Sequence, residues 1–141
     1  MKTAAFALVA LLLAAPTVAA SRPAVVAVRD PVIRPAVTGQ PVTAAYMTLV
    51  NPGAEPLKLT AVNCDCAGMV EPHESTMAGG VLRMRSAAVT VPPHGAISFQ
   101  PGGLHLMVMD LKRAIRPGDQ VPMRLSFDHG SPVIVSFAAR K

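Results

Sequence analysis

The chain of 141 residues contains little of several residue types, and each shortage excludes a class of protein. It has no tryptophan, one tyrosine and four phenylalanines, and only 15% of its residues are charged. A disordered chain carries more charge and fewer apolar residues than the 51% found here, so the sequence predicts a folded protein. The length supports one domain and excludes a large multidomain enzyme.

Motifs that carry catalytic chemistry are also absent. The sequence has no Gly-x-Ser-x-Gly nucleophile elbow, no phosphate-binding glycine loop and no His-Glu-x-x-His motif. Its basic residues are scattered and are not interleaved with aromatic residues, so nothing indicates nucleic-acid binding. We therefore expect that the protein is not an enzyme and does not bind nucleic acid.

The N-terminus has the pattern of a secretory signal peptide. Lys2 precedes an unbroken apolar run over 4–15, a proline ends that run, and Val18-Ala19-Ala20 offers small residues to a signal peptidase. The run is shorter than the about 20 apolar residues of a membrane span. We expect removal of residues 1–20, which leaves residues 21–141 as a single exported domain that does not span the membrane.

Proline and glycine interrupt the mature chain at short intervals. They leave no long stretch with a sustained 3.6-residue apolar repeat, so long helices are not expected. Between the breaks lie short segments rich in Val, Ile, Leu, Thr and Phe, and the expected strands are 25–29, 43–51, 57–63, 81–84, 88–91, 96–100, 104–109, 120–128 and 133–138. Short strands separated by turns favour an all-β fold, an antiparallel β-sandwich.

Methionine is unusually frequent in the middle of the chain. Five of the eight methionines fall within 69–109, together with three of the four histidines. If 104–109 is a strand, its period of two places His105, Met107 and Met109 on one face and leaves the other face for the core. Methionine also fills gaps in cores, and we expect that role for the two that lie inside alternating strands, Met47 and Met123.

A cluster of imidazole and thioether groups selects a particular metal. Thioether sulfur is soft and uncharged and favours Cu(I), and imidazole also suits copper. A blue-copper electron-transfer centre needs a cysteine between its histidine ligands, and neither Cys64 nor Cys66 lies in such a position. The residues therefore predict carriage of Cu(I) and not electron transfer.

The order of these residues resembles that of the PCuAC family of periplasmic copper chaperones, also called copper chaperone A. In that family the ligands run His, ten residues, Met, about twenty residues, then His-x-Met. The order is met here by His73, Met84, His105 and Met107. The similarity covers roughly 44–137, and its other matching segments are 45–51, 73–77, 80–84, 101–109 and 118–122.

The resemblance implies both a fold and a role. The fold would be a cupredoxin-like β-barrel or sandwich with Greek-key connections, binding one Cu(I) ion at an exposed edge. The role would be delivery toward the Cu(A) centre of cytochrome c oxidase, with oxidase subunit II or another copper chaperone as the partner. Met77 and Met109 would shield the ion or serve as spare ligands.

Three features depart from the family pattern. The gap between the second and third ligands is about one residue shorter than in the family. Pro72 stands directly before His73, where the family has an apolar strand residue, so we expect that strand to be altered or to lie at a sheet edge. Cys64 and Cys66 have no counterpart in the family. In an oxidising periplasm they suggest a disulfide, either local or between two molecules. A dithiol that binds a second copper ion and a thiol–disulfide function are the alternatives.

Three other functions use the same residues differently. A copper-sequestering or resistance protein would have the same site without a delivery partner. A structural or adhesive β-sandwich would use its methionines only as core and would bind no metal. A thiol oxidoreductase would depend on Cys64 and Cys66, and it has the least support because no thioredoxin-like βαβ pattern surrounds them.

Overall fold

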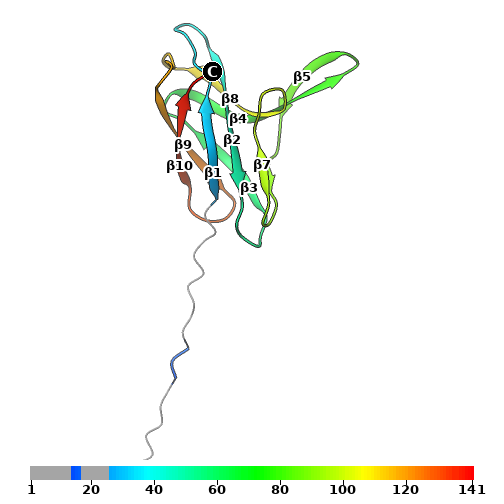
Figure 1. Cartoon of the computed structure of the whole chain (residues 1–141), viewed down its shortest axis with the longest axis vertical. Helices are drawn as coiled ribbons and strands as arrows, with labels where there is room; N and C mark the ends of the chain where they lie inside the picture. Colours follow the sequence, from blue (N-terminus) through cyan, green and yellow to red (C-terminus); the bar gives the residue numbers. More distant parts are fainter. Residues whose placement is uncertain (1–13, 17–25) are drawn as a thin grey trace, which may run out of the picture.

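The computed structural model describes residues 14–16 and 26–141, and the expected signal peptide, 1–20, lies almost entirely outside the described residues. The described part contains ten strands and no helix (Figure 1). It accordingly has no helix long and apolar enough to cross a membrane. The strands are β1 (Ala27–Ile33), β2 (Val42–Val50), β3 (Leu57–Asn63), β4 (Ala67–Ala78), β5 (Val81–Ser86), β6 (Thr90–Val91), β7 (Ala96–Ser98), β8 (Leu104–Leu111), β9 (Gln120–Phe127) and β10 (Val133–Ala139).

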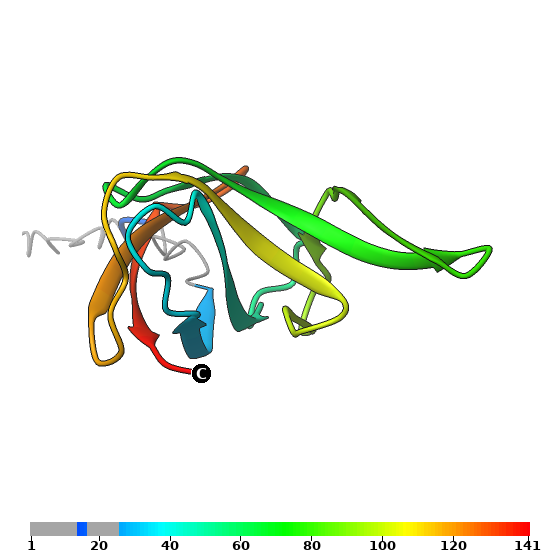
Figure 2. The ribbon, with the colours of Figure 1, turned by 90° about the horizontal axis from the view of Figure 1, so that it is seen from above.

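The strands form one sheet that curls back on itself, in the order β5-β4-β8-β2-β1-β10-β9-β3-β6, with β7 paired to β2. A further pairing of β3 with β4, through Val62 and Val70, closes the barrel (Figure 2). Several neighbours in the sheet are distant in the sequence, as Greek-key connections require. The structure thus confirms the predicted all-β barrel or sandwich.

The antiparallel prediction has one exception, the pairing of β1 with β10. These two strands run parallel, with Val32 opposite Ala138 and Ile33 opposite Ala139. Parallel neighbours cannot be joined by a tight hairpin and need a long connection. Since β1 and β10 are the first and last strands, the whole domain lies between them in the sequence and this requirement is met.

The core follows the two-residue alternation of the strands. In β2 the inward side chains include Ala45, Met47 and Leu49, and in β9 they include Met123 and Leu125, all buried. Methionine therefore packs into the core at both positions expected from the sequence. The outward residues of the same strands remain available for a surface site.

Each of the nine expected strands overlaps an observed strand, but β4 was not predicted. It contains a glycine, a proline and two glutamates, which are all depleted in strands. Tertiary pairing overrides these local preferences, because β4 pairs with β8 over 67–74 and with β5 over 73–78. Long strands can contain such residues when both neighbours supply a ladder.

Pro72 lies in β4 one residue before the pairing with β5 begins. Its carbonyl oxygen accepts a hydrogen bond of 2.9 Å from the backbone N–H of Ala87, just beyond β5. Because the N–H and C=O of a strand residue point to the same side, the N–H that proline lacks also faces away from β8. The proline therefore removes no bond from the β4–β8 ladder, although it is not on an outer strand.

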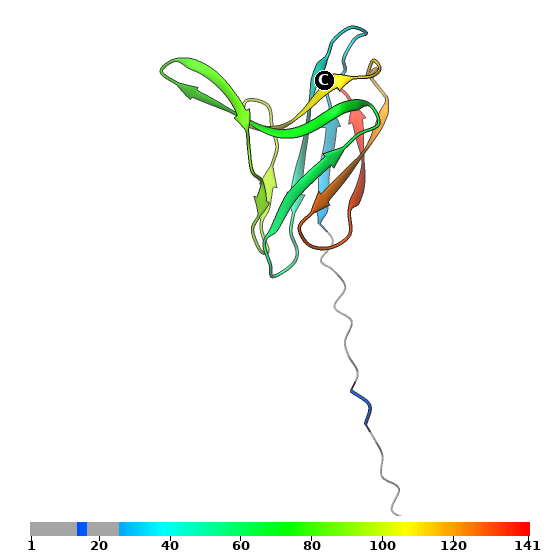
Figure 3. The same cartoon turned by 180° about the vertical axis from the view of Figure 1, so that it is seen from behind.

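The β4–β5 hairpin projects beyond the body of the barrel (Figures 1 and 3). Its turn is Gly79-Gly80, and both glycines have positive φ values, 60° and 77°, which a glycine adopts without strain. The hairpin carries four of the large apolar side chains that the described chain exposes: Met77, Val81, Leu82 and Met84. It is thus an exposed apolar arm and does not contribute to the core.

Asn51 ties the end of β2 to the loops beside it. Its side chain is fully buried, and its amide nitrogen donates to the backbone oxygens of Glu55 (2.6 Å) and Val91 (3.3 Å). Its Oδ1 accepts from the N–H of Gly53 at 2.9 Å, and its own N–H donates to Gly95 at 2.8 Å. Every polar group of this buried side chain therefore has a partner.

We expect Asn51→Ala to lower the free energy of unfolding by about 2–4 kcal/mol, because three side-chain hydrogen bonds are lost and buried backbone groups lose their partners. Urea unfolding followed by circular dichroism measures the change. The matched control is Asn63→Ala at the exposed end of β3, which should shift the free energy by less than about 0.5 kcal/mol. Equal effects in the two variants would contradict a special role for Asn51.

Candidate metal centre

The two histidines predicted as ligands lie side by side on neighbouring strands. His73 on β4 and His105 on β8 are directly opposite each other in the ladder. Directly opposed residues project from the same face of a sheet. Their ring centroids are 6.3 Å apart, with an angle of 41° between the ring planes. Residues 32 positions apart in the chain thus meet because β4 and β8 pair in this register.

Met107 and Met84 extend the same face in two directions. Met107 follows His105 by two residues on β8, so it projects to the same side, and it lies opposite Glu71 of β4. Met84 on β5 lies opposite Ser75, which follows His73 by two residues on β4. The register therefore places all four predicted residues on the outer face of three adjacent strands.

A surface pocket of about 590 Å³ lies on this face. Met84, His105 and Met107 line it, together with side chains that include Tyr46 and Arg34. His73 is not part of this lining, but its ring centroid lies 6.3 Å from that of His105. Three of the four predicted residues therefore share one pocket, and the fourth lies beside one of them.

His105 is held in a defined orientation. Its side chain is on the outer face but only 6% of the residue is exposed, and its Nδ1 lies 2.9 Å from the carbonyl oxygen of Gly103. A carbonyl can only accept, so Nδ1 carries the proton, and the Nε2 of the neutral ring keeps a free lone pair. The same Gly103 oxygen accepts from the backbone N–H of Ser75 at 3.3 Å. This arrangement is typical of a metal-binding histidine, whose other ring nitrogen is anchored by a hydrogen bond.

His73 has a weaker partner. Its Nε2 lies 3.4 Å from a carboxylate oxygen of Glu71, near the long limit for a hydrogen bond. A proton on Nε2 shared with Glu71 leaves Nδ1 of the neutral ring free as a donor to a metal. Glu71 was not singled out from the sequence, and the only signal for it is the alternation of 69, 71 and 73 in a strand that the sequence did not reveal.

The donor set on this face excludes the harder metals. The described part of the chain contains no cluster of three or more His, Cys, Asp or Glu side chains that could hold a metal ion. Zn²⁺, Ca²⁺ and Mg²⁺ sites are built from such groups. The four predicted residues instead offer two imidazole nitrogens and two thioether sulfurs, which are donor types that suit Cu(I).

The two secondary methionines lie at opposite ends of the face. Met109 is on β8, two residues beyond Met107, and is partly buried. Met77 is on the projecting hairpin, opposite Leu82, and is 67% exposed. Met69, which sequence reasoning did not consider, lies directly opposite Met109.

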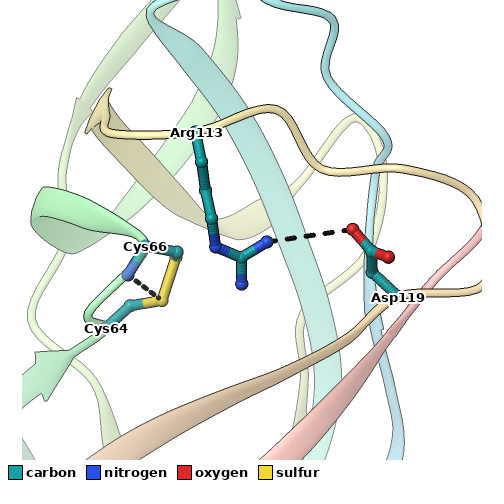
Figure 4. The surroundings of a disulfide bond; sticks show 4 residues. All are labelled: Cys64, Cys66, Arg113 and Asp119. Atoms are coloured by element: carbon teal, nitrogen blue, oxygen red, sulfur yellow. Dashed lines mark hydrogen bonds and ion pairs between the residues drawn. A yellow bond between two sulfur atoms is a disulfide. The ribbon is translucent and has the colours of Figure 1, made fainter.

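Cys64 and Cys66 form a disulfide within the turn between β3 and β4 (Figure 4). Their Cα atoms are 5.1 Å apart, and Cys66 is buried. Of the alternatives that the sequence left open, the structure adopts the local disulfide. Disulfide sulfurs have no thiolate to offer, so a second copper site on these two cysteines is not compatible with this state. Intermolecular pairing is excluded for the same reason, since both sulfurs are used.

The turn with the disulfide is fastened to the segment after β8. The carbonyl oxygen of Cys66 accepts a hydrogen bond of 2.9 Å from the backbone N–H of Lys112. The next residue, Arg113, reaches toward Asp119 with a separation of 3.8 Å (Figure 4). Such a surface ion pair adds at most about 1 kcal/mol, so the backbone contact is the more important tie.

Comparison with known proteins adds to the geometry. The model of a family described as LpqE-like lipoproteins matches residues 26–139. A protein of Leifsonia xyli subsp. xyli that is named as a lipoprotein, Lxx21020, is 29% identical over 101 residues, and this covers 69% of the chain and 61% of that protein. The uncharacterized protein RP573 of Rickettsia prowazekii is 30% identical over 96 residues, covering 67% of the chain and 53% of that protein. The chain thus spans less than two thirds of either relative.

Solved structures with the same fold include copper-related domains. The apo PCuAC domain from PmoF1 matches with a TM-score of 0.70 and 26% identity, covering 82% of the chain and 92% of that domain. The Cu(I) form of DR1885 from Deinococcus radiodurans matches with a TM-score of 0.65 and 28% identity, covering 84% of the chain and 78% of that structure. These similarities confirm the resemblance to the PCuAC family and the cupredoxin-like fold.

Replacing both cysteines tests whether the disulfide is structural. We expect Cys64→Ala combined with Cys66→Ala to lower the free energy of unfolding by about 1.5 kcal/mol, the loop-closure value for a three-residue ring. Urea unfolding with and without reductant measures it, and reductant should destabilise the wild type but not the variant. Uptake of one Cu(I) per chain should be retained, and its complete loss in the folded variant would contradict a purely structural role for the disulfide.

Proposed function

The chain belongs to the LpqE-like family, and we propose that it is a periplasmic metallochaperone that carries Cu(I) on His73, Met84, His105 and Met107. One observation carries the proposal: Met84, His105 and Met107 line a single pocket, and the ring of His73 lies 6.3 Å from that of His105. The similarity to the Cu(I) form of DR1885, at 28% identity, supports copper as the cargo.

The four side chains divide into a fixed part and an exposed part. His105 is buried and anchored by Gly103, so it is a ready-made nitrogen donor. Met84 is 53% exposed and lies on the hairpin that projects from the barrel. A competing ligand can therefore approach the copper ion next to the exposed Met84 while His105 still coordinates the ion. That accessibility suits an ion that is cargo and must leave.

The chemistry of the donors suits transport through an oxidising compartment. Thioethers are neutral and do not titrate, so only the two imidazoles must be unprotonated for binding. The cysteines cannot supply the thiolate of a blue-copper centre because both are in the disulfide. We therefore infer carriage of the ion without electron transfer or catalysis.

Export and the recipient are further parts of the proposal. The signal-peptide pattern of residues 1–20 and the lipoprotein names among the relatives support a periplasmic location. The resemblance to PCuAC domains favours delivery toward the Cu(A) centre of cytochrome c oxidase, directly to subunit II or through another copper chaperone. A sequestering protein would have the same site, so delivery needs its own test.

The ligand assignment predicts one Cu(I) bound tightly per chain in competition with a chromophoric chelator. His105→Ala and Met107→Ala should each lower the affinity at least about tenfold, because each removes a direct donor. Loss of a group that only contacts a ligand typically lowers metal affinity about 10- to 100-fold, so loss of the ligand itself should cost at least as much. The matched control is Met123→Leu, which alters a buried methionine of β9 and should leave the affinity unchanged.

Copper should also raise the melting temperature of the wild type, since an ion that binds only the folded state stabilises it. Unchanged affinity in both ligand variants would refute the assignment. No uptake and no stabilisation at all would favour a structural β-sandwich.

Delivery and sequestration predict different phenotypes. If the protein delivers copper, deleting its gene should lower cytochrome c oxidase activity, and added copper should restore that activity. The deletion strain should not become more sensitive to copper. Complementation with the wild-type gene should rescue the activity, and complementation with His105→Ala should not. A deletion strain with normal oxidase activity and increased copper sensitivity would instead establish sequestration.

A further inference from the structure

The outer face of the β4–β8 pair carries three consecutive cross-strand pairs. They are His73 with His105, Glu71 with Met107, and Met69 with Met109. The first two pairs contain three of the residues assigned to copper. The third pair lies beyond the four proposed ligands, and its two members are directly opposed thioethers.

The Met69–Met109 pair is not needed to fill the core. On the inner face of the same strands, Val70 lies opposite Val108, and both are buried. Met69 is 47% exposed, and Met109 is only partly buried. A methionine that fills a core gap lies inside the barrel, as Met47 does. Met69 and Met109 instead lie on the outer face, and both residues keep some exposure to solvent.

The geometry of a sheet brings the two sulfurs together. Directly opposed residues have Cβ atoms about 4.5–5.5 Å apart, and methionine has a flexible unbranched side chain, so both sulfurs can approach one ion. Two neutral soft donors without a thiolate or carboxylate select Cu(I) or Ag(I) over Zn²⁺. A site with two donors should bind more weakly than one with four.

The pair also lies next to the principal site. Met109 follows Met107 by two residues on β8, a distance of about 6.8 Å along a strand. An ion between the two pairs can exchange one thioether for the next without ever being released. The transfer is a ligand exchange in which copper stays Cu(I) and no proton or electron moves.

We propose that Met69 and Met109 form a second, weaker Cu(I) site at which the ion waits on its way to or from the four-residue site. The evidence that this pair binds metal is the β4–β8 register alone. Its role as an intermediate site during copper transfer rests on the proposed function. Soft metal would then occupy two positions on one face, and the second would fill only after the first.

The test is a titration of the full mature chain with Ag(I), and separately with Cu(I) under anaerobic conditions. The NMR signals of the methionine methyl groups are recorded at each step. We expect the Met107 and Met84 signals to shift with the first equivalent and those of Met69 and Met109 with the second. In Met69→Leu combined with Met109→Leu, the second equivalent should bind at least tenfold more weakly, while the first should still bind. Leucine conserves volume, and Met69→Leu alone provides a milder variant.

The matched control is Met123→Leu, which replaces a buried core methionine of β9 and should leave both equivalents unchanged. The inference is overturned if no second equivalent binds, if it binds equally well to the double variant, or if the Met69 and Met109 signals stay fixed. The His105→Ala variant separates this failure from that of the proposed function. Suppose that His105→Ala binds the first equivalent as tightly as the wild type does, and that its Met69 and Met109 signals still shift. The second site is then supported, and the assignment of His105 as a ligand is wrong.

Discussion

The register of β4 against β8 is the constraint on which the proposed metal centre depends. It places His73 opposite His105 and sends both rings to the outer face. In a sheet, a slip of one residue moves every side chain of a strand to the other face. A slip of β4 would bring His73 toward the core and leave Val70 outside. The arrangement of the donors is therefore a consequence of strand pairing, not of any local sequence.

Several packed groups hold that register. The inner faces of the two strands present Val70, Leu106 and Val108, which are buried and would be exposed by a slip. At one end of β4, the disulfide turn is joined to Lys112 by a backbone hydrogen bond. At the other, the Gly103 carbonyl binds both Ser75 and the ring of His105. The core thus specifies the register, and the same contacts orient one of the proposed ligands.

The face combines rigidity with access. His105 is enclosed, whereas Met84 on β5 and Met69 on β4 are about half exposed and lie toward opposite ends of β4 from the His73–His105 pair. A permanent centre would be expected to surround its metal with buried donors. Neutral sulfur donors at the surface, beside an anchored imidazole, instead favour an ion that arrives and leaves. The projecting hairpin adds exposed apolar side chains next to Met84, where an acceptor protein would have to approach.

The sequence by itself determined the all-β class, because proline and glycine leave room only for short strands, and it determined the soft character of the donor set through the order of its histidines and methionines. It also indicated the outer face of β8, since a period of two places His105, Met107 and Met109 together. It did not reveal β4, whose glycine, proline and glutamates are poor strand formers, and so it could not show that Met69 faces Met109 or that Glu71 lies beside His73. It left the state of Cys64 and Cys66 open between several pairings. Only the tertiary structure decided these points, because they depend on which strands are neighbours and in which register, and long-range pairing is not encoded in any single segment.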